Sequence, residues 1–311
     1  MKKMQIAALV LILFLLSCGK NPVIEENMLD GDVIFDATLY DPDSVLISLS
    51  HANPSAADLS KPVIIAAHGY TATTFEWQEF RDWADGHGDI LVSQVLLGGH
   101  GLDYESFKAS TWEDWRAPIL AEYQALHELG FTNINLIGSS TGCPLIVKLL
   151  ADDAFKNYVT PNEVFLVDPM VIPSNKLLSI ISVVGPMLGY TETEVTDGTR
   201  SYWYTFRPQE TLQELMEVAS VVRVELEDGI QLPENTQLKV YKSSRDASAD
   251  PIGAVMLYKG MELSDGGKID VEMYDSDLHV MTRLAAREDL SQADMDIQLE
   301  IFEDVRTRVL D

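Results

Sequence analysis

The chain has 311 residues, of which 46% are hydrophobic, enough for one large α/β domain or two small domains with a sizeable core. Its 22 Lys and Arg stand against 49 Asp and Glu, which gives a formal net charge of -27 at pH 7. A strongly acidic protein is disfavoured on nucleic acids and on anionic lipid surfaces, so we expect no nucleic-acid partner, and a neutral substrate fits better than a polyanionic one.

The N-terminus carries an apolar segment of its own. A short basic start is followed by eleven apolar residues, Ile6 to Leu16, and then by Cys18. The run is too short to span a bilayer comfortably, and its flanks are typical of a secretory signal. The ending resembles that of a bacterial lipoprotein signal, which implies loss of residues 1–17, diacylglycerol on the Cys18 thiol and residues 18–30 as a tether. We therefore expect a lipid-anchored membrane lipoprotein of the bacterial cell envelope, facing the periplasm or the surface; an ordinary signal peptide or an uncleaved anchor is the alternative.

After this segment, strands alternate with helices along the chain. Alternation of this kind predicts parallel βαβ units, that is, an α/β domain with a mostly parallel sheet over residues 31–311. The predicted strands are Val33–Phe35, Val45–Leu49, Pro62–Ala67, Ile90–Leu97, Asn133–Ile137, Glu163–Val167, Gln237–Tyr241 and Ile269–Tyr274. The predicted helices are Phe75–Ala84, Trp112–Leu129, Cys143–Leu150 and Gln292–Leu310.

One insertion interrupts the alternation, at about residues 170–207. It contains a very apolar stretch, Leu177 to Leu188, and the aromatic cluster Tyr202-Trp203-Tyr204. We expect a small helical cap whose apolar stretch lines an acyl pocket, since pockets of this kind suit hydrophobic ligands. A buried helix pair that only shields the sheet is the alternative.

A G-x-S-x-G turn, Gly138 to Gly142, lies between the fifth predicted strand and the helix after it. This context is typical of a nucleophile elbow, in which a tight turn exposes a serine, here Ser140. Flanking glycines are expected because side chains there would collide with neighbouring backbone. The helix N-terminus behind Ser140 also directs unpaired N–H groups towards a developing oxyanion.

His68-Gly69-Tyr70-Thr71 follows an earlier strand and resembles the oxyanion loop of α/β-hydrolases. The resemblance implies that the backbone N–H groups of Tyr70 and Thr141 form an oxyanion hole. His68, and His100 in the next loop, are expected to be structural.

Over residues 60 to 310 the chain resembles α/β-hydrolases of the bacterial carboxylesterase and monoacylglycerol-lipase-like group. In that family the triad runs in the order Ser, acid, His. Asp246, in a loop after a strand and followed by Pro251, matches the position of the acid. Asp250 and Asp168 remain alternatives for the acid. Asp250 precedes a proline, where a side chain more often caps the following helix, and Asp168 lies at the end of an earlier strand.

The base should follow the last strand, and among the six histidines only His279 does so. Its surroundings, S-x-x-H-V-x-T, are close to the histidine loop of the family. The resemblance thus implies a triad of Ser140, Asp246 and His279 that works through an acyl-enzyme without metal or cofactor.

The expected activity is a serine carboxylic-ester hydrolase of esterase or lipase type. Its expected substrates are short- to medium-chain, neutral hydrophobic esters such as monoacylglycerols. Amidase, thioesterase or peptidase activity on the same triad remains open, as does a non-catalytic lipoprotein that binds an apolar ligand.

Overall fold

The computed structural model describes residues 22–25, 28–31, 53–174, 189–193, 195–196 and 198–311. The predicted signal peptide with Cys18, the two strands within 33–49 and the whole apolar stretch 177–188 lie outside these residues. No helix in the described ranges has both the length and the hydropathy that a membrane crossing requires.

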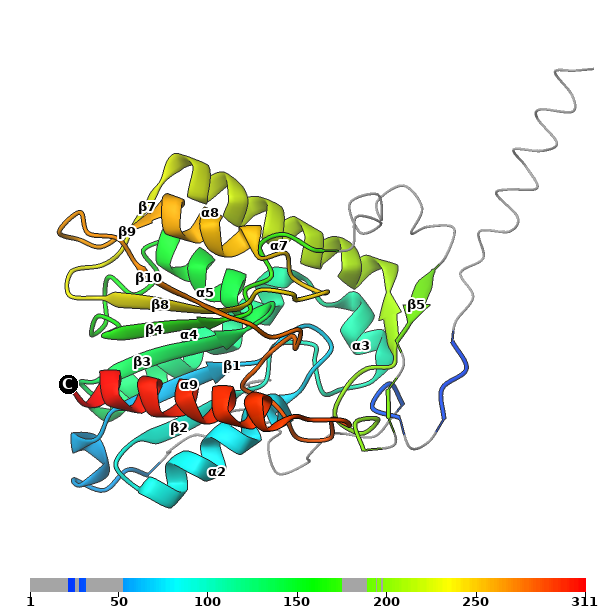
Figure 1. Cartoon of the computed structure of the whole chain (residues 1–311), viewed down its shortest axis with the longest axis horizontal. Helices are drawn as coiled ribbons and strands as arrows, with labels where there is room; N and C mark the ends of the chain where they lie inside the picture. The colour runs from blue at the N-terminus through cyan, green and yellow to red at the C-terminus, as the bar shows by residue number, and fades with distance from the viewer. Residues whose placement is uncertain (1–21, 26–27, 32–52, 175–188, 194, 197) are drawn as a thin grey trace, which may run out of the picture.

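In the described part of the chain, the central sheet has six strands, all parallel, in the order β10-β8-β4-β3-β1-β2 (Figure 1). The strands are β1 (Val63–Ala67), β2 (Leu91–Val95), β3 (Ile134–Ser139), β4 (Glu163–Val167), β8 (Gln237–Ser243) and β10 (Asp270–Tyr274). Every residue of β1, β2 and β3 is buried, because helices cover both faces of the sheet. The predicted α/β fold with a parallel sheet is confirmed.

The helices divide between the two faces of the sheet (Figure 1). One face packs against α2 (Gln78–His87) and α9 (Gln292–Leu310). The other packs against α4 (Trp112–Leu129) and α5 (Gly142–Ala151), with α7 (Gln209–Asp228) next to α5 and α8 (Ile252–Gly260) next to α7. Two separate apolar layers therefore hold the sheet in the middle of the domain.

Capping residues explain where two of the predicted helices begin. Thr111 accepts a hydrogen bond from the N–H of Asp114 in a capping box at the start of α4, and Gly130 ends that helix at φ 99°. Ser291 and Asp294 form the same box at the start of α9. The predictions for α4 and α9 are confirmed.

Other elements differ from the prediction or are missing from it. The predicted helix 75–84 is a 3-10 turn, η3 (Thr74–Trp77), followed by α2, which continues to His87. Sequence reasoning missed α7, although Leu212, Leu215 and Val222 recur at helical spacing and are buried. It also missed α8, α3 (Tyr104–Ala109), η2 (Asp58–Ser60) and the two-residue parallel pair β7 (Ile230–Gln231) and β9 (Met261–Glu262).

Within the described residues of the insertion, the regular structure is an antiparallel pair, β5 (Tyr190–Glu192) and β6 (Phe206–Pro208). The pair is fixed to the N-terminal segment by Asp30, whose carboxylate accepts hydrogen bonds from the N–H of Thr205 at 2.8 Å and of Phe206 at 2.9 Å. Met28, Leu29 and Asp30 are buried, so the last residues of the expected tether are packed into the domain.

Candidate active site

Ser140 lies in the tight turn between β3 and α5, where its φ of 48° is in the left-handed region that non-glycine residues seldom adopt. A Cβ on Gly138 would lie 2.8 Å from Cδ1 of Ile146, and one on Gly142 would lie 2.5 Å from the carbonyl oxygen of Ala67. We expected glycines on both sides of Ser140 because side chains there would collide with their neighbours, and these distances confirm it. The turn needs both glycines and holds the serine in a strained conformation.

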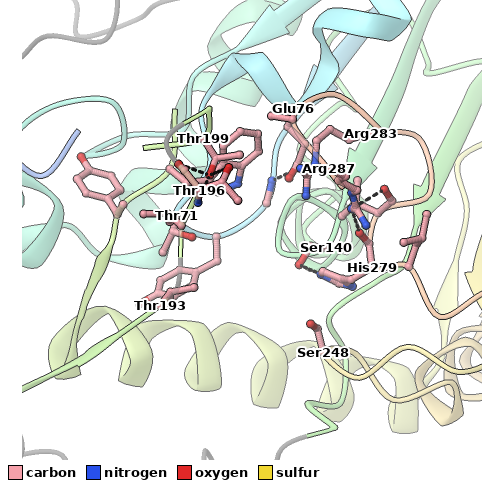
Figure 2. A pocket seen from close by; sticks show the side chains of 18 of the residues that line it. Thr71, Glu76, Ser140, Thr193, Thr196, Thr199, Ser248, His279, Arg283 and Arg287 are labelled. Carbon is pink, nitrogen blue, oxygen red and sulfur yellow. Dashed lines mark hydrogen bonds between the residues drawn. The ribbon is translucent and has the colours of Figure 1, made fainter. Parts of the chain in front are cut away.

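Ser140, His279 and Asp246 form one hydrogen-bonded chain. His279 Nε2 lies 2.9 Å from Ser140 Oγ, and His279 Nδ1 lies 2.8 Å from Asp246 Oδ2 (Figure 2). The three residues follow β3, β10 and β8, whose carboxyl ends meet at one edge of the parallel sheet. This edge brings together side chains that are 139 and 33 positions apart.

Asp246 is ionised by its surroundings. Its Oδ1 accepts hydrogen bonds from the N–H groups of Ser248 and Ala249, while its Oδ2 lies 2.6 Å from Nζ of Lys242 as well as near His279. Burial alone would raise the pKa of Asp246, but the hydrogen bonds and charges of His279 and Lys242 outweigh burial and lower the pKa to about 2. The carboxylate is therefore a fixed negative charge beneath the imidazole.

The two alternative acids have other partners. Asp168 is fully buried, and its carboxylate accepts from Lys242 Nζ at 2.9 Å and from the backbone N–H groups of Ser243 and Val280. It braces the loop that carries His279 rather than bonding to the ring. Asp250 accepts from the N–H of Ile252 at the start of α8. Of the three candidate acids, Asp246 is the one bonded to the imidazole.

Asp168, Asp246 and His279 offer ligand atoms within 4.8 Å of one another, a spacing that a metal ion also needs. Nζ of Lys242 already lies between the two carboxylates, at 2.9 and 2.6 Å. An ammonium in that position supplies the positive charge that a metal would otherwise bring, so these residues do not fit a metal site.

The predicted oxyanion loop runs directly past Ser140. A Cβ on Gly69 would lie 2.9 Å from the Cβ of Ser140, so only a glycine fits. Oε1 of the buried Glu76 accepts the N–H of Gly69 at 2.7 Å and contacts Ser139 Oγ, and so ties this loop to the elbow. Among the described residues, no protein acceptor is bonded to the N–H of Tyr70 or of Thr141.

His68 and His100 contact backbone groups. His68 Nε2 accepts the N–H of Leu97 at 3.0 Å and its Nδ1 lies 2.9 Å from the carbonyl oxygen of Gly69. Burial lowers the pKa of His68 to about 4, so the ring is neutral. His100 packs 5.2 Å from His68, centroid to centroid. Both rings support the loops beside the elbow.

Comparison with known proteins agrees with this architecture. No protein-family model and no curated protein sequence matches the chain. Many solved structures are similar to it, among them the three that follow. A structure from the metagenome-derived lipolytic enzymes LipS and LipT is 18% identical with a TM-score of 0.63 and covers 80% of this chain and 94% of that one. A soluble variant of monoglyceride lipase from Saccharomyces cerevisiae is 10% identical with a TM-score of 0.65. The match covers 85% of this chain and 90% of that one. The monoacylglycerol lipase of Paleococcus ferrophilus is 12% identical with a TM-score of 0.61. The match covers 80% of this chain and 96% of that one.

The chain has the α/β-hydrolase fold.

In the described structure, a cavity of about 530 Å³ opens above Ser140 and His279. Its described lining mixes polar and apolar residues, and the apolar stretch 177–188, which was expected to line an acyl pocket, lies outside the described residues. Hydroxyl groups of Thr71, Thr193, Thr196 and Thr199 line one side, and Arg283 and Arg287 lie beside Glu76 on another (Figure 2). Arg207, from β6, completes a set of three guanidinium groups around the cavity.

Sequence reasoning missed several charged residues of this site, among them Glu76, Lys242, Arg283 and Arg287. A signal was present for Lys242, because a lysine next to the apolar residues Val240 and Tyr241 of a central strand needs an anionic partner if it is buried. No comparable signal marked the arginines, which lie in an irregular loop after His279.

Proposed function

We propose that the chain is a serine hydrolase that cleaves carboxylic esters through a covalent acyl-enzyme. One observation carries the proposal: Ser140, strained at the elbow, is hydrogen-bonded to His279, which is hydrogen-bonded to an ionised Asp246. A serine hydroxyl becomes an effective nucleophile when a base takes its proton and a third group orients that base.

The proposed reaction has two steps. In the first, Ser140 Oγ attacks the ester carbonyl while its proton passes to His279 Nε2, and the tetrahedral intermediate collapses as His279 returns the proton to the leaving alcohol. In the second, His279 takes a proton from water, the hydroxide attacks the acyl-enzyme, and Ser140 regains its proton as the acid leaves. Asp246 stabilises the imidazolium in both steps.

The N–H groups of Tyr70 and Thr141 are the proposed oxyanion donors. In support, both belong to the backbone that flanks Ser140, and neither donates to a protein acceptor among the described residues. One such donor contributes about 3–4 kcal/mol to lowering the barrier in comparable sites.

Two further proposals come from the sequence. The substrates expected from the sequence are esters of short to medium acyl chains, and the lipolytic and monoacylglycerol-lipase neighbours support an ester substrate, although the arginines that line the cavity argue against a wholly neutral one. The segment ending at Cys18 supports lipid anchoring in a bacterial cell envelope. Loss of the protein from the membrane fraction in Cys18→Ala would support the anchor, and unchanged retention would contradict it.

The activity is tested with p-nitrophenyl esters and a fluorophosphonate probe. Ser140→Ala should abolish both hydrolysis and labelling, whereas Ser60→Ala, an exposed serine remote from the cavity, should keep both. Equal rates in wild type and Ser140→Ala would refute the proposal. Absence of labelling in the folded wild type would instead favour a non-catalytic ligand-binding protein, and matched amides and thioesters would separate esterase from amidase or thioesterase.

A further inference from the structure

Three arginines line the cavity without an ion pair in the described part of the chain. Arg283 Nη1 donates to the carbonyl oxygen of Ala285 at 3.2 Å, and Arg287 Nη2 donates to the carbonyl oxygens of His279 and Val280. The Nε atoms of Arg207, Arg283 and Arg287 are buried and have no hydrogen-bond partner. Each guanidinium group thus lines the cavity with N–H donors that no described acceptor satisfies.

Aromatic faces take the place of carboxylates as supports for two of these groups. The guanidinium carbon of Arg283 lies 4.8 Å from the centroid of the Trp203 ring, and that of Arg207 lies 6.0 Å from the ring of Tyr70. Stacking of this kind fixes the direction of a guanidinium group without neutralising it.

The nearest acids are bound to other groups. Glu76 is bonded through Oε1 to the backbone of Gly69, and Oε2 of Glu79 accepts the N–H groups of Leu284 and Ala285 at 2.7 Å each. Both carboxylates attract Arg283 from a distance, but burial outweighs them and lowers the pKa of that guanidinium group. Burial also lowers the pKa of Arg287 to about 10, which still leaves it charged at neutral pH.

Elsewhere in the described chain most arginines have an acidic partner within ion-pair distance. Such pairs are Arg81–Asp85, Arg116–Asp152, Arg200–Glu25, Arg245–Asp275, Arg306–Asp89 and Arg308–Asp270. In a chain with more than twice as many acids as bases, partners for three more arginines are abundant. Their gathering at the cavity without partners therefore indicates a ligand that supplies the negative charge.

We propose that the substrate is an ester whose non-reacting part carries a single carboxylate, bound by Arg283 and Arg287 with Arg207 nearby. The inference rests on the proposed esterase function and specifies its substrate class. The charged lining consists of the three arginines with Glu76 and Glu288, so one positive charge is left over, which matches a monoanion better than a dianionic phosphate. The strongly acidic remainder of the protein also repels polyanions.

Two matched pairs of esters test the proposal. One pair places the charge on the acyl side, p-nitrophenyl hydrogen glutarate against p-nitrophenyl pentanoate. The other places it on the alcohol side, the butanoate ester of 4-hydroxybenzoate against that of its methyl ester. We expect kcat/KM for the charged member to be at least about 10-fold higher in one of the pairs.

The variant Arg283→Gln should remove that preference, mainly through KM, by about 10- to 100-fold. Arg283 has no described contact with Ser140, Asp246 or His279, so hydrolysis of the neutral esters should fall much less than that of the charged member, and thermal unfolding reports whether the variant is folded. Arg81→Gln, which removes a paired arginine on α2, is the matched control. Arg283→Lys should restore part of the preference.

The two hypotheses fail in different ways. If both members of both pairs are hydrolysed equally, or if Arg283→Gln keeps the preference, the carboxylate site is refuted while the esterase stands. If no ester is hydrolysed, calorimetric titration of Ser140→Ala with the charged and neutral esters still decides the question. Tighter binding of a charged member that is lost on adding Arg283→Gln would support the site, and equal binding would refute it.

Discussion

The ammonium of Lys242 lies 2.6 Å from Oδ2 of Asp246, the same carboxylate oxygen that faces Nδ1 of His279 at 2.8 Å. Lys242 is fully buried, and its Nζ also reaches Asp168 at 2.9 Å. The acid beneath the imidazole is thus shared with a permanent cation. Lys242 acts through Asp246 and is a positioning residue, because it has no described contact with Ser140 or with the cavity.

Lys242→Met should lower kcat/KM by about 10-fold or more, because two buried carboxylates lose their common partner. Breaking such a buried pair costs about 3–5 kcal/mol of stability. The acid limb of the pH profile should move to higher pH, since removal of a positive charge makes protonation of the His279–Asp246 pair easier.

Lys239→Met is the matched control for that prediction. Lys239 lies on the same strand and is paired with Glu272 and Asp304, remote from Asp246. The Lys239→Met variant should be less stable than the wild type, but its pH profile should not shift. A Lys242→Met enzyme with an unshifted acid limb would contradict the positioning role.

Gly69→Ala should reduce kcat by about 10- to 100-fold, because the new methyl group would lie 2.9 Å from Cβ and 3.5 Å from Oγ of Ser140. Gly86→Ala is the control, since nothing lies within 4 Å of its Cβ position in α2. It should keep full activity and raise stability by about 0.5–1 kcal/mol. Steady-state kinetics with thermal unfolding measures both effects, and an unimpaired Gly69→Ala enzyme would contradict the close approach of the two backbones.

Glu76→Gln should retain activity within about threefold, because a side-chain oxygen still accepts the N–H of Gly69. Glu76→Leu removes that acceptor, so the buried N–H of Gly69 and hydroxyl of Ser139 lose their bond to Glu76. This loss should cost about 1–3 kcal/mol of stability. The expected loss of kcat in Glu76→Leu, with KM for a neutral ester nearly unchanged, would show that Glu76 positions the loop beside Ser140. Equal kinetics in the two variants would argue against this.

Glu163→Gln should stabilise the protein in a pH-dependent way. Burial, opposed in part by Arg308, raises the pKa of Glu163 to about 7, against roughly 4.3 in an unfolded chain. The folded state binds this proton more tightly, so the carboxyl group lowers stability progressively as pH rises from about 4 to 7. Urea unfolding should therefore show no gain for Glu163→Gln near pH 4 and a gain of roughly 1–2 kcal/mol at pH 8.

Glu128→Gln, at an exposed position in the last turn of α4, is the control for the pH experiment and should show no comparable trend. A gain for Glu163→Gln that is the same at pH 4 and pH 8 would contradict the raised pKa.

The sheet and the meeting of Ser140, Asp246 and His279 were accessible from the sequence for a physical reason. Parallel strands present their carboxyl ends at one edge, so residues that follow different strands become neighbours without any local signal. Apolar runs such as Val63–Ala67 and capped helices such as Trp112–Leu129 were predictable from pattern alone.

The lining of the cavity was not accessible in this way. Arg207 and Arg283 come from a short strand and an irregular loop, and no periodicity relates them. Lys242 is visible only as a charge beside apolar residues of β8, which predicts an anionic partner but not which one. The positions of Arg207, Arg283 and Lys242 depend on contacts between segments that are far apart in the sequence.

The bonds of Asp30 to Thr205 and Phe206 close a loop of about 175 residues. Pairings with so large a sequence separation form late in folding, because the chain must lose much of its freedom before they contribute. The wall beside the cavity is therefore among the parts expected to assemble late and to open before the sheet. Amide hydrogen exchange at Thr205 and Phe206 would measure that opening, and with it the rate at which the interior becomes accessible to large ligands.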